Sequence, residues 1–256
     1  MSVDVIRSDL LAGMPHGFLG RRGGVSIGEM WGLNVGYGSG DDPDLIAENR
    51  KRAIDAVLPG ASLATVHQIH SPTVVAVEHA WAQDERPQAD AMVTDRPGLL
   101  LGVLTADCTP VLFADRETGV IGAAHSGWRG AFGGVNEATI DAMEKLGARR
   151  DRIAAAVGPC VLQQSYEVDE AFRANFLTQD RGNDRFFVTG PVGKPHFDLS
   201  GFILHRLDAA GIGTAEALSL DTYSDPNRFY SYRRSTHLNE PSYGRQISMI
   251  GLPSKS

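Results

Sequence analysis

The chain holds two cysteines, and one of them lies in a stretch whose residue types could do chemistry. Between Ala106 and Gly134 the chain carries Cys108 and, seventeen positions later, His125 at the end of an apolar run. A glycine-rich turn with Arg129 follows the histidine directly. A thiol, an imidazole and a cation within one strand–loop–strand–loop unit indicate the floor of an active site.

Three interpretations of Cys108 and His125 stay open at this point. In the first, both bind a metal ion together with a third residue, since a thiolate and imidazoles suit zinc or copper. In the second, Cys108 attacks a carbonyl carbon and His125 is its general base. In the third, the thiol is buried and inert, and the imidazole is hydrogen-bonded at a strand end. The spacing does not separate the three, because the partners would meet only through tertiary folding.

The turn SGWRGAFGG leads into a predicted helix at about residues 132–146. A glycine-rich turn before a helix offers free backbone N–H groups and the positive end of the helix dipole, a combination that binds anions. Arg129 lies within the turn and strengthens this interpretation. We therefore predict a phosphate or carboxylate contact here.

The elements that must position these residues are strands. Three apolar runs, at residues 99–107, 110–115 and 120–125, predict a central sheet with short turns that allow antiparallel pairing. The stretch at 65–77 predicts an earlier strand, interrupted at Ser71–Pro72. Alternation on that strand would place His67 and His70 on opposite faces, so we do not expect both to bind one metal.

A helix is predicted from Asp42, a good N-cap, to the Pro59–Gly60 stop. Arg50 lies on it, either as a surface cation or turned toward a phosphate. The chain shows no internal repeat and no low-complexity linker, so we expect a single domain over residues 1–256.

Composition excludes several classes of protein. The chain has 256 residues, 42% of them apolar and 21% charged, which is typical of a globular protein. The net charge of −7 disfavours nucleic acid as a partner. No apolar run reaches the roughly 18 residues that span a bilayer, and the N-terminal stretch does not resemble a signal peptide. We therefore expect a cytoplasmic protein without a membrane partner, whose two cysteines are free thiols or ligands rather than a disulfide.

Several well-known motifs do not occur. The sequence has no phosphate-binding GxxxxGK[ST] loop, no GxGxxG after its first strand and no GxSxG elbow. It also lacks the His-x-His and Cys-His clusters that a multi-copper electron-transfer chain requires.

A family resemblance rests on the blocks VHQIHS, DAMVTD, TADCTPVL, AAHSGWRG, GPC…SYEV and DPNRFYSYRR…GRQ. On these the chain resembles the YfiH-like family from residue 34 to residue 250. That family is also called laccase-domain or peptidoglycan editing factor, and was once labelled multicopper polyphenol oxidase. The resemblance implies an α+β fold, a four-layer α/β/β/α sandwich related to cysteine-hydrolase folds.

The resemblance also implies one zinc ion, held by two histidines and a cysteine. Those positions match His70, Cys108 and His125, and copper is less suited to the site. Asp107, which directly precedes the expected ligand Cys108, is then a candidate for a residue that orients this ligand without binding the metal itself. Together with the three ligands, Arg129 is expected to take part in catalysis.

The activity implied by the resemblance is that of a purine nucleoside enzyme. Such enzymes cleave adenosine, inosine and methylthioadenosine with phosphate and deaminate adenosine. We hypothesise that Arg129, with Arg50, holds phosphate, and that Asn34, Gln68 and Tyr230 bind base or sugar. The alternative activity is amide hydrolysis that edits a wrong amino acid on a UDP-MurNAc peptidoglycan precursor. A non-catalytic, zinc-stabilised binding protein is the third possibility, and the oligomeric state stays open, a homodimer included.

One departure from the family pattern is visible. Relatives commonly have Cys-Thr-Tyr where this chain has Asp221–Thr222–Tyr223. Any role of that cysteine elsewhere therefore does not carry over to this chain.

Overall fold

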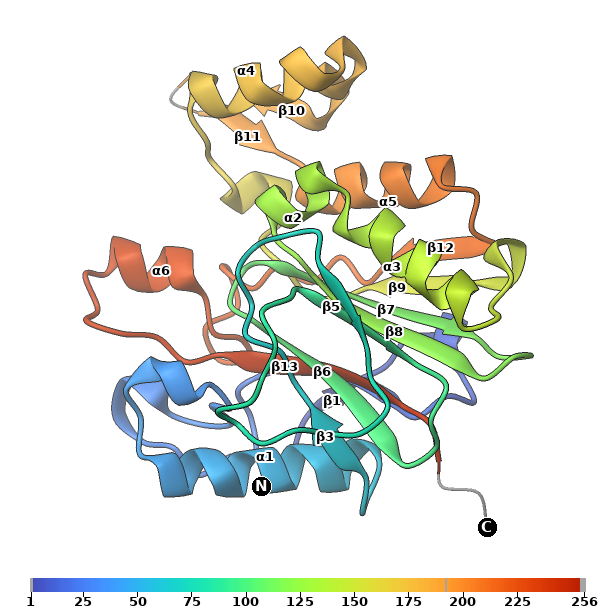
Figure 1. Ribbon diagram of the computed structural model, residues 1–256. Coiled ribbons are helices and arrows are strands. Elements are labelled where there is room, and N and C mark those ends of the chain that lie inside the picture. Colours follow the sequence, from blue (N-terminus) through green and yellow to red (C-terminus); the bar gives the residue numbers. More distant parts are fainter. Residues whose placement is uncertain (1, 192, 254–256) are drawn as a thin grey trace.

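The structure is a computed structural model that describes residues 2–191 and 193–253. Two β-sheets form its centre, and helices lie on the outer side of each sheet (Figure 1). The five-stranded sheet has the order β1 (Val5–Ile6), β2 (His16–Leu19), β13 (Gln246–Gly251), β6 (Leu99–Thr105) and β3 (Ser62–Ala64). The six-stranded sheet has the order β12 (Thr214–Ala217), β9 (Ala154–Val157), β7 (Thr109–Asp115), β8 (Val120–Ser126), β5 (Ala91–Thr94) and β4 (Val74–Ala76). A separate hairpin pairs β10 (Phe187–Thr189) with β11 (Pro195–Phe197).

The helices occupy the two outer layers and the rim. Helix α1 lies below the five-stranded sheet, whereas α2, α3 and α5 lie above the six-stranded one in the view of Figure 1. Helix α4 and the β10–β11 hairpin stand beyond α2 and α5 in that view, and α6 projects at one side (Figure 1). The helices are α1 (Pro43–Val57), α2 (Trp128–Gly133), α3 (Val135–Lys145), α4 (Glu170–Gln179), α5 (Leu199–Ala209) and α6 (Tyr232–His237). Short 3₁₀ helices occur at Asp9–Leu11, Gly28–Met30, Tyr37–Ser39, Arg150–Arg152, Gln163–Ser165 and Arg181–Phe186.

The two sheets pack face to face through a layer of fully buried side chains. Phe18, Leu101 and Ile250 come from the five-stranded sheet, and Leu112 and Ile121 come from the six-stranded one. Strands β6, β7 and β8 are covered on both faces, which explains why their sequences are nearly continuous apolar runs. This layer is the middle of the molecule, and it confirms the predicted α/β/β/α arrangement.

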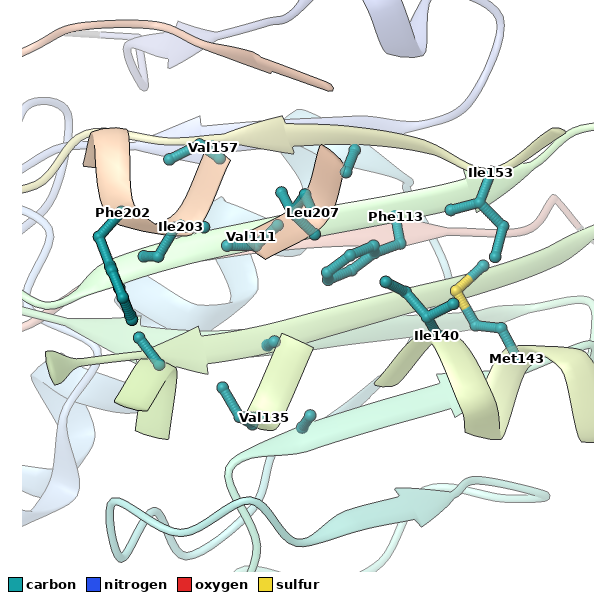
Figure 2. Packing of buried hydrophobic residues seen from close by; sticks show 14 of the residues in the cluster. Val111, Phe113, Val135, Ile140, Met143, Ile153, Val157, Phe202, Ile203 and Leu207 are labelled. Carbon is teal, nitrogen blue, oxygen red and sulfur yellow. The ribbon is translucent and has the colours of Figure 1, made fainter. Parts of the chain in front are cut away.

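The outer layers are equally apolar. On one side, Ala53 and Val57 of α1 pack against strand residues of the five-stranded sheet. On the other, Figure 2 shows Ile140 of α3 and Leu207 of α5 packed against the sheet around Phe113. Burying side chains of this size stabilises a fold by roughly 1.5–3 kcal/mol each, so these contacts fix where the helices lie.

Helix α1 begins as its sequence predicts. The carboxylate of Asp42 accepts a hydrogen bond from the Asp44 N–H, and Pro43 occupies the first turn, where its missing N–H costs nothing. The helix predicted at 132–146 is instead two helices, because Gly134 adopts a left-handed conformation at φ 90° between α2 and α3. None of the described helices is long and apolar enough to cross a membrane.

Two strand predictions need correction. Strands β7 and β8 pair antiparallel as predicted, but β6 belongs to the other sheet. A strand buried on both faces looks the same in either sheet, so the apolar pattern does not tell which sheet it joins. The strand predicted at 65–77 forms only at β4 and as a single bridge at His67, and His70 has a left-handed backbone with φ 60°. The alternation argument for His67 and His70 therefore fails, since the backbone there is not extended.

Candidate functional site

The structure brings His70, Cys108 and His125 together. Their potential ligand atoms all lie within 4.8 Å of one another. The Cys108 Sγ is 3.9 Å from the His70 Nε2, and the two imidazole rings meet edge to face with centroids 4.8 Å apart. The three residues come from separate places: the loop before β4, the crossing from β6 to β7, and the end of β8.

Cys108 is positioned by the sharp crossing between the sheets. Asp107, directly before it, has φ 83°, a conformation that non-glycine residues rarely adopt. Its buried carboxylate accepts hydrogen bonds from the Thr222 hydroxyl (2.7 Å), the Ser231 hydroxyl (2.9 Å) and the Arg233 N–H (2.7 Å). Asp107 thus fixes the backbone next to Cys108 and ties the crossing to the start of α6.

Asp90 holds the two histidines, and sequence reasoning missed it. Its fully buried carboxylate accepts a hydrogen bond from the His125 Nδ1 at 2.8 Å. It also accepts from three consecutive N–H groups, those of Ile69, His70 and Ser71, and from the Ser71 hydroxyl. One carboxylate therefore fixes the unusual backbone at His70 and leaves the His125 Nε2 free to face Cys108 and His70. The block DAMVTD contained this residue, but nothing in its spacing marked it as a partner of a histidine.

Opposite charges stabilise the ionised forms within the cluster. Burial alone would raise the pKa of the Cys108 thiol, but His125 and His70 outweigh it and lower the pKa to about 6. Burial likewise would lower the pKa of His125, but Cys108 and Asp90 raise it to about 9. At neutral pH the two residues therefore form a thiolate–imidazolium pair when no metal is bound. The other cysteine, Cys160, is buried, and burial raises its pKa to about 12.

The backbone beside the cluster must be glycine. A Cβ at Gly127 would lie 2.8 Å from the Cys108 Sγ and 3.3 Å from the His70 Cδ2. Contacts this short do not occur between unbonded atoms without a shift. The glycine therefore leaves the space that the cluster occupies.

The donor set fits a zinc ion. A tetrahedral zinc with ordinary bond lengths separates a sulfur and a nitrogen ligand by about 3.5 Å, close to the distance between Cys108 and His70. Three protein ligands leave one coordination position open, as catalytic zinc sites do. Within residues 2–191 and 193–253 this is the single group of three or more such side chains close enough to share an ion. The described part of the chain therefore offers no second centre for a multi-copper chain.

A cavity of about 660 Å³ adjoins the cluster, which is large enough for a nucleoside. His70 and Cys108 form part of its wall, which also contains several aromatic and cationic side chains. Trp128 is held by an edge-to-face contact with Phe172 of α4, with ring centroids 5.0 Å apart. The residues around the cavity are His70, Ala106, Asp107, Cys108, Trp128, Arg129, Val161, Tyr166, Leu199, Tyr232, Arg233, Thr236, His237 and Tyr243.

Two arginines supply positive charge to this cavity. Arg129 is exposed, lies over the Trp128 ring at 5.1 Å and forms no ion pair with the residues that the structure describes. Arg233, which the sequence did not single out, lies over the Tyr166 ring at 5.0 Å and donates to the Glu167 carbonyl. The turn predicted over SGWRGAFGG is wrong, because residues 128–133, Arg129 included, form helix α2. This helix has only six residues, so the positive charge at the cavity comes from the arginine side chains.

The four residues predicted to bind base, sugar or phosphate do not line this cavity. Asn34 is fully buried and bonds to Ser39, Asp41 and the backbone. Gln68 bonds through both amide atoms to the backbone of Leu104. The hydroxyl of Tyr230 donates to backbone carbonyls at residues 30 and 31, and the Arg50 Nε donates to the Val35 carbonyl. Their role in binding stays a prediction.

Asp221, at the position where the family resemblance implied a cysteine in relatives, makes structural contacts. Its carboxylate accepts from the Leu162 N–H and from the Ser165 hydroxyl at 2.6 Å. It therefore holds the loop after β9 in place.

The fold and site define a class: a two-sheet α+β protein with a His–Cys–His cluster where the chain crosses between the sheets. The chain belongs to the family described as multi-copper polyphenol oxidoreductase laccase, whose model matches residues 15–253. It is 42% identical to a purine nucleoside phosphorylase of Deinococcus radiodurans over 251 residues, 97% of this chain and 93% of the relative. It is 40% identical to the purine nucleoside phosphorylase ORF3 of Streptomyces griseus over 231 residues, 89% of this chain and 92% of the relative.

Solved structures agree with this assignment. The crystal structure of protein NMB0706 from Neisseria meningitidis superposes with a TM-score of 0.88 at 32% identity, covering 99% of this chain and all of that one (100%). The crystal structure of YfiH from Bacillus licheniformis superposes with a TM-score of 0.87 at 28% identity, covering 98% and 96% of the two chains. The YfiH-like resemblance is therefore confirmed.

Proposed function

We propose that the chain is a zinc-dependent purine nucleoside phosphorylase. It cleaves adenosine, inosine and methylthioadenosine with phosphate, and it deaminates adenosine. The observation that carries the proposal is the His70–Cys108–His125 cluster, of which His70 and Cys108 line a nucleoside-sized cavity that is also lined by Arg129 and aromatic rings. Relatives named as purine nucleoside phosphorylases, similar over nearly the whole chain, support it.

The roles of the residues follow from their contacts. A zinc ion, when bound, supplies a Lewis acid with one open coordination position. Arg129 projects into the cavity with its guanidinium unpaired in the described structure, so it is placed to bind phosphate. Trp128 and Tyr166 offer flat apolar faces against which a purine packs. Asp90 keeps His125 in the tautomer that presents Nε2 to the metal.

The test combines a metal analysis with a nucleoside assay on the same preparation. Release of free base from inosine only in the presence of phosphate, and release of inosine from adenosine, are the expected results. His70→Ala should abolish both zinc content and turnover, whereas His79→Ala, a change of an exposed histidine outside the cavity, should alter neither. A zinc-loaded protein that turns over no nucleoside would contradict the proposal and favour a binding protein.

One observation favours a second candidate, amide hydrolysis of a misloaded peptidoglycan precursor. The Cys108 thiol is partly exposed, its pKa is lowered to about 6, and His125 lies beside it. A thiolate next to an imidazolium is the usual arrangement of a cysteine nucleophile. Turnover of UDP-MurNAc-L-serine without nucleoside turnover would favour this candidate.

A further inference from the structure

His237 lines the same cavity as His70 and Cys108 of the His–Cys–His cluster, although its position in the sequence did not indicate this. It is the last residue of α6, far along the chain from Cys108 and Arg129. Its side chain is exposed and therefore in contact with solvent as well as with the cavity.

A tyrosine fixes the orientation of this imidazole. The Tyr223 Oη lies 3.0 Å from the His237 Nδ1, and the two rings meet edge to face at 78° with centroids 5.6 Å apart. With Nδ1 engaged, Nε2 is the ring nitrogen left to face a molecule in the cavity. A histidine whose one nitrogen is held and whose other is free is the usual arrangement of a general acid or base.

Hydrogen bonds also fix Tyr223 and His237 relative to the His–Cys–His cluster. Arg234 of α6 donates to the carbonyls of Thr222 (2.7 Å) and Tyr223 (2.9 Å), which locks the tyrosine to the helix that carries the histidine. The start of α6 is tied to Asp107 through the Ser231 hydroxyl and the Arg233 N–H. Since Asp107 precedes a cluster residue directly, one network spans from the cluster to His237.

We propose that His237, positioned by Tyr223, donates a proton to the departing purine base in the nucleoside cleavage described above, so this inference rests on that function. As the bond between N9 and C1′ breaks, its electron pair moves into the purine ring. The proton on the His237 Nε2 passes to N7 of the base, while a phosphate oxygen forms the new bond to C1′. The imidazole ends neutral and regains its proton from solvent, which its exposure permits.

The experiment compares two substrates that differ in their need for a proton. Inosine needs protonation of its leaving base, whereas the phenolate of 4-nitrophenyl β-D-ribofuranoside leaves without it. His237→Gln should lower kcat for inosine by about 100-fold or more, the usual contribution of a general acid, with little change in KM. The same variant should cleave the nitrophenyl riboside almost as fast as the unmodified protein. His79→Gln is the matched control, with no expected effect on either substrate.

A second variant tests the positioning residue. Tyr223→Phe keeps the ring but removes the hydroxyl that holds the imidazole, so we expect a loss in kcat for inosine smaller than that of His237→Gln and again none for the nitrophenyl riboside. Zinc content and thermal midpoint are measured for every variant, so that a folding defect is recognised.

The results distinguish a failure of the His237 role from a failure of the proposed nucleoside phosphorylase function. Equal losses on both substrates would assign His237 a packing role and overturn the inference alone. An unaffected His237→Gln variant of a protein that cleaves inosine would do the same. A zinc-loaded, unmodified protein that cleaves neither substrate would overturn the proposed function and this inference together.

Discussion

Replacing Asp90 by asparagine should weaken both metal binding and the fold. The change keeps the shape of the side chain but turns one acceptor oxygen into an N–H₂ group that faces donors. Oδ1 receives the His70 and His125 donors, and Oδ2 receives the Ile69 N–H and both Ser71 donors. In either orientation of the amide, one set of donors is left unsatisfied inside the protein.

The expected loss of folding free energy follows from the pKa of the Asp90 carboxyl. Burial would raise the pKa of Asp90, but the hydrogen bonds from His125, Ser71 and His70 lower it from 3.8 to about 2. A depression of this size corresponds to about 2 kcal/mol of folding free energy. Because the folded pKa is the lower one, this stabilisation is complete above the unfolded value and is lost as pH falls through about 2. Asp90→Asn lacks this stabilisation at neutral pH. Its zinc affinity should also fall by roughly 10–100-fold, because His125 is no longer oriented by a carboxylate.

Urea unfolding without metal and zinc titration against a competing chelator measure the two effects. Asp115→Asn is the matched control, since Asp115 is also fully buried and lies at the opposite end of β7 from the cluster. Its carboxylate accepts from the backbone at residues 117, 118 and 149. The control should lose stability but keep its zinc affinity. If Asp90→Asn behaved like the control, the claim that Asp90 orients the metal ligands would be refuted.

Three further predictions concern the cluster and the cavity. Gly127→Ala should lower zinc affinity more than tenfold, because the new Cβ would lie 2.8 Å from the Cys108 sulfur. Gly38→Ala is the control, since a Cβ there has no atom within 4 Å. An unchanged zinc affinity of Gly127→Ala in a chelator titration would contradict the steric argument. Zinc binding at pH 7.5 should release about one proton, because Cys108 with a pKa of about 6 is already a thiolate whereas His125 with a pKa of about 9 must lose its proton. Calorimetry in buffers of different ionisation enthalpy measures this release, and zinc affinity should fall about tenfold per pH unit below about 9 and more steeply below about 6. Arg129→Ala should raise the KM for phosphate about tenfold or more in the inosine assay, and an unchanged KM would remove Arg129 from the anion site.

The family resemblance predicted the layers of the fold, whereas the apolar pattern did not predict the connection between the two sheets. The apolar runs that became β6, β7 and β8 were recognised, yet β6 lies in the other sheet. Periodicity reports how many faces of a strand are buried, and both sheets bury both faces of these strands. The crossing depends on the left-handed Asp107 and its three hydrogen-bond donors, which come from more than a hundred residues later in the chain.

The same limit applies to the site. His70, Cys108 and His125 were brought together by a family resemblance, and the structure places them in one cluster. Their spacing alone left three interpretations open. Asp90 and Arg233 were not found, because a buried carboxylate and a cavity arginine look like any other charged residue until tertiary contacts are known.

The crossing between the sheets has a consequence for the order of folding. The cluster draws His70 and Cys108 from two connections between the five-stranded and the six-stranded sheet, β3 to β4 and β6 to β7, and His125 from β8 of the six-stranded sheet. We therefore expect the cluster to assemble only after the two sheets have docked, so that a metal ion would be bound late in folding. An ion that binds only this docked state adds about 2.7 kcal/mol at a free concentration one hundred times its Kd. The protein's resistance to unfolding should thus rise and fall with the supply of free zinc.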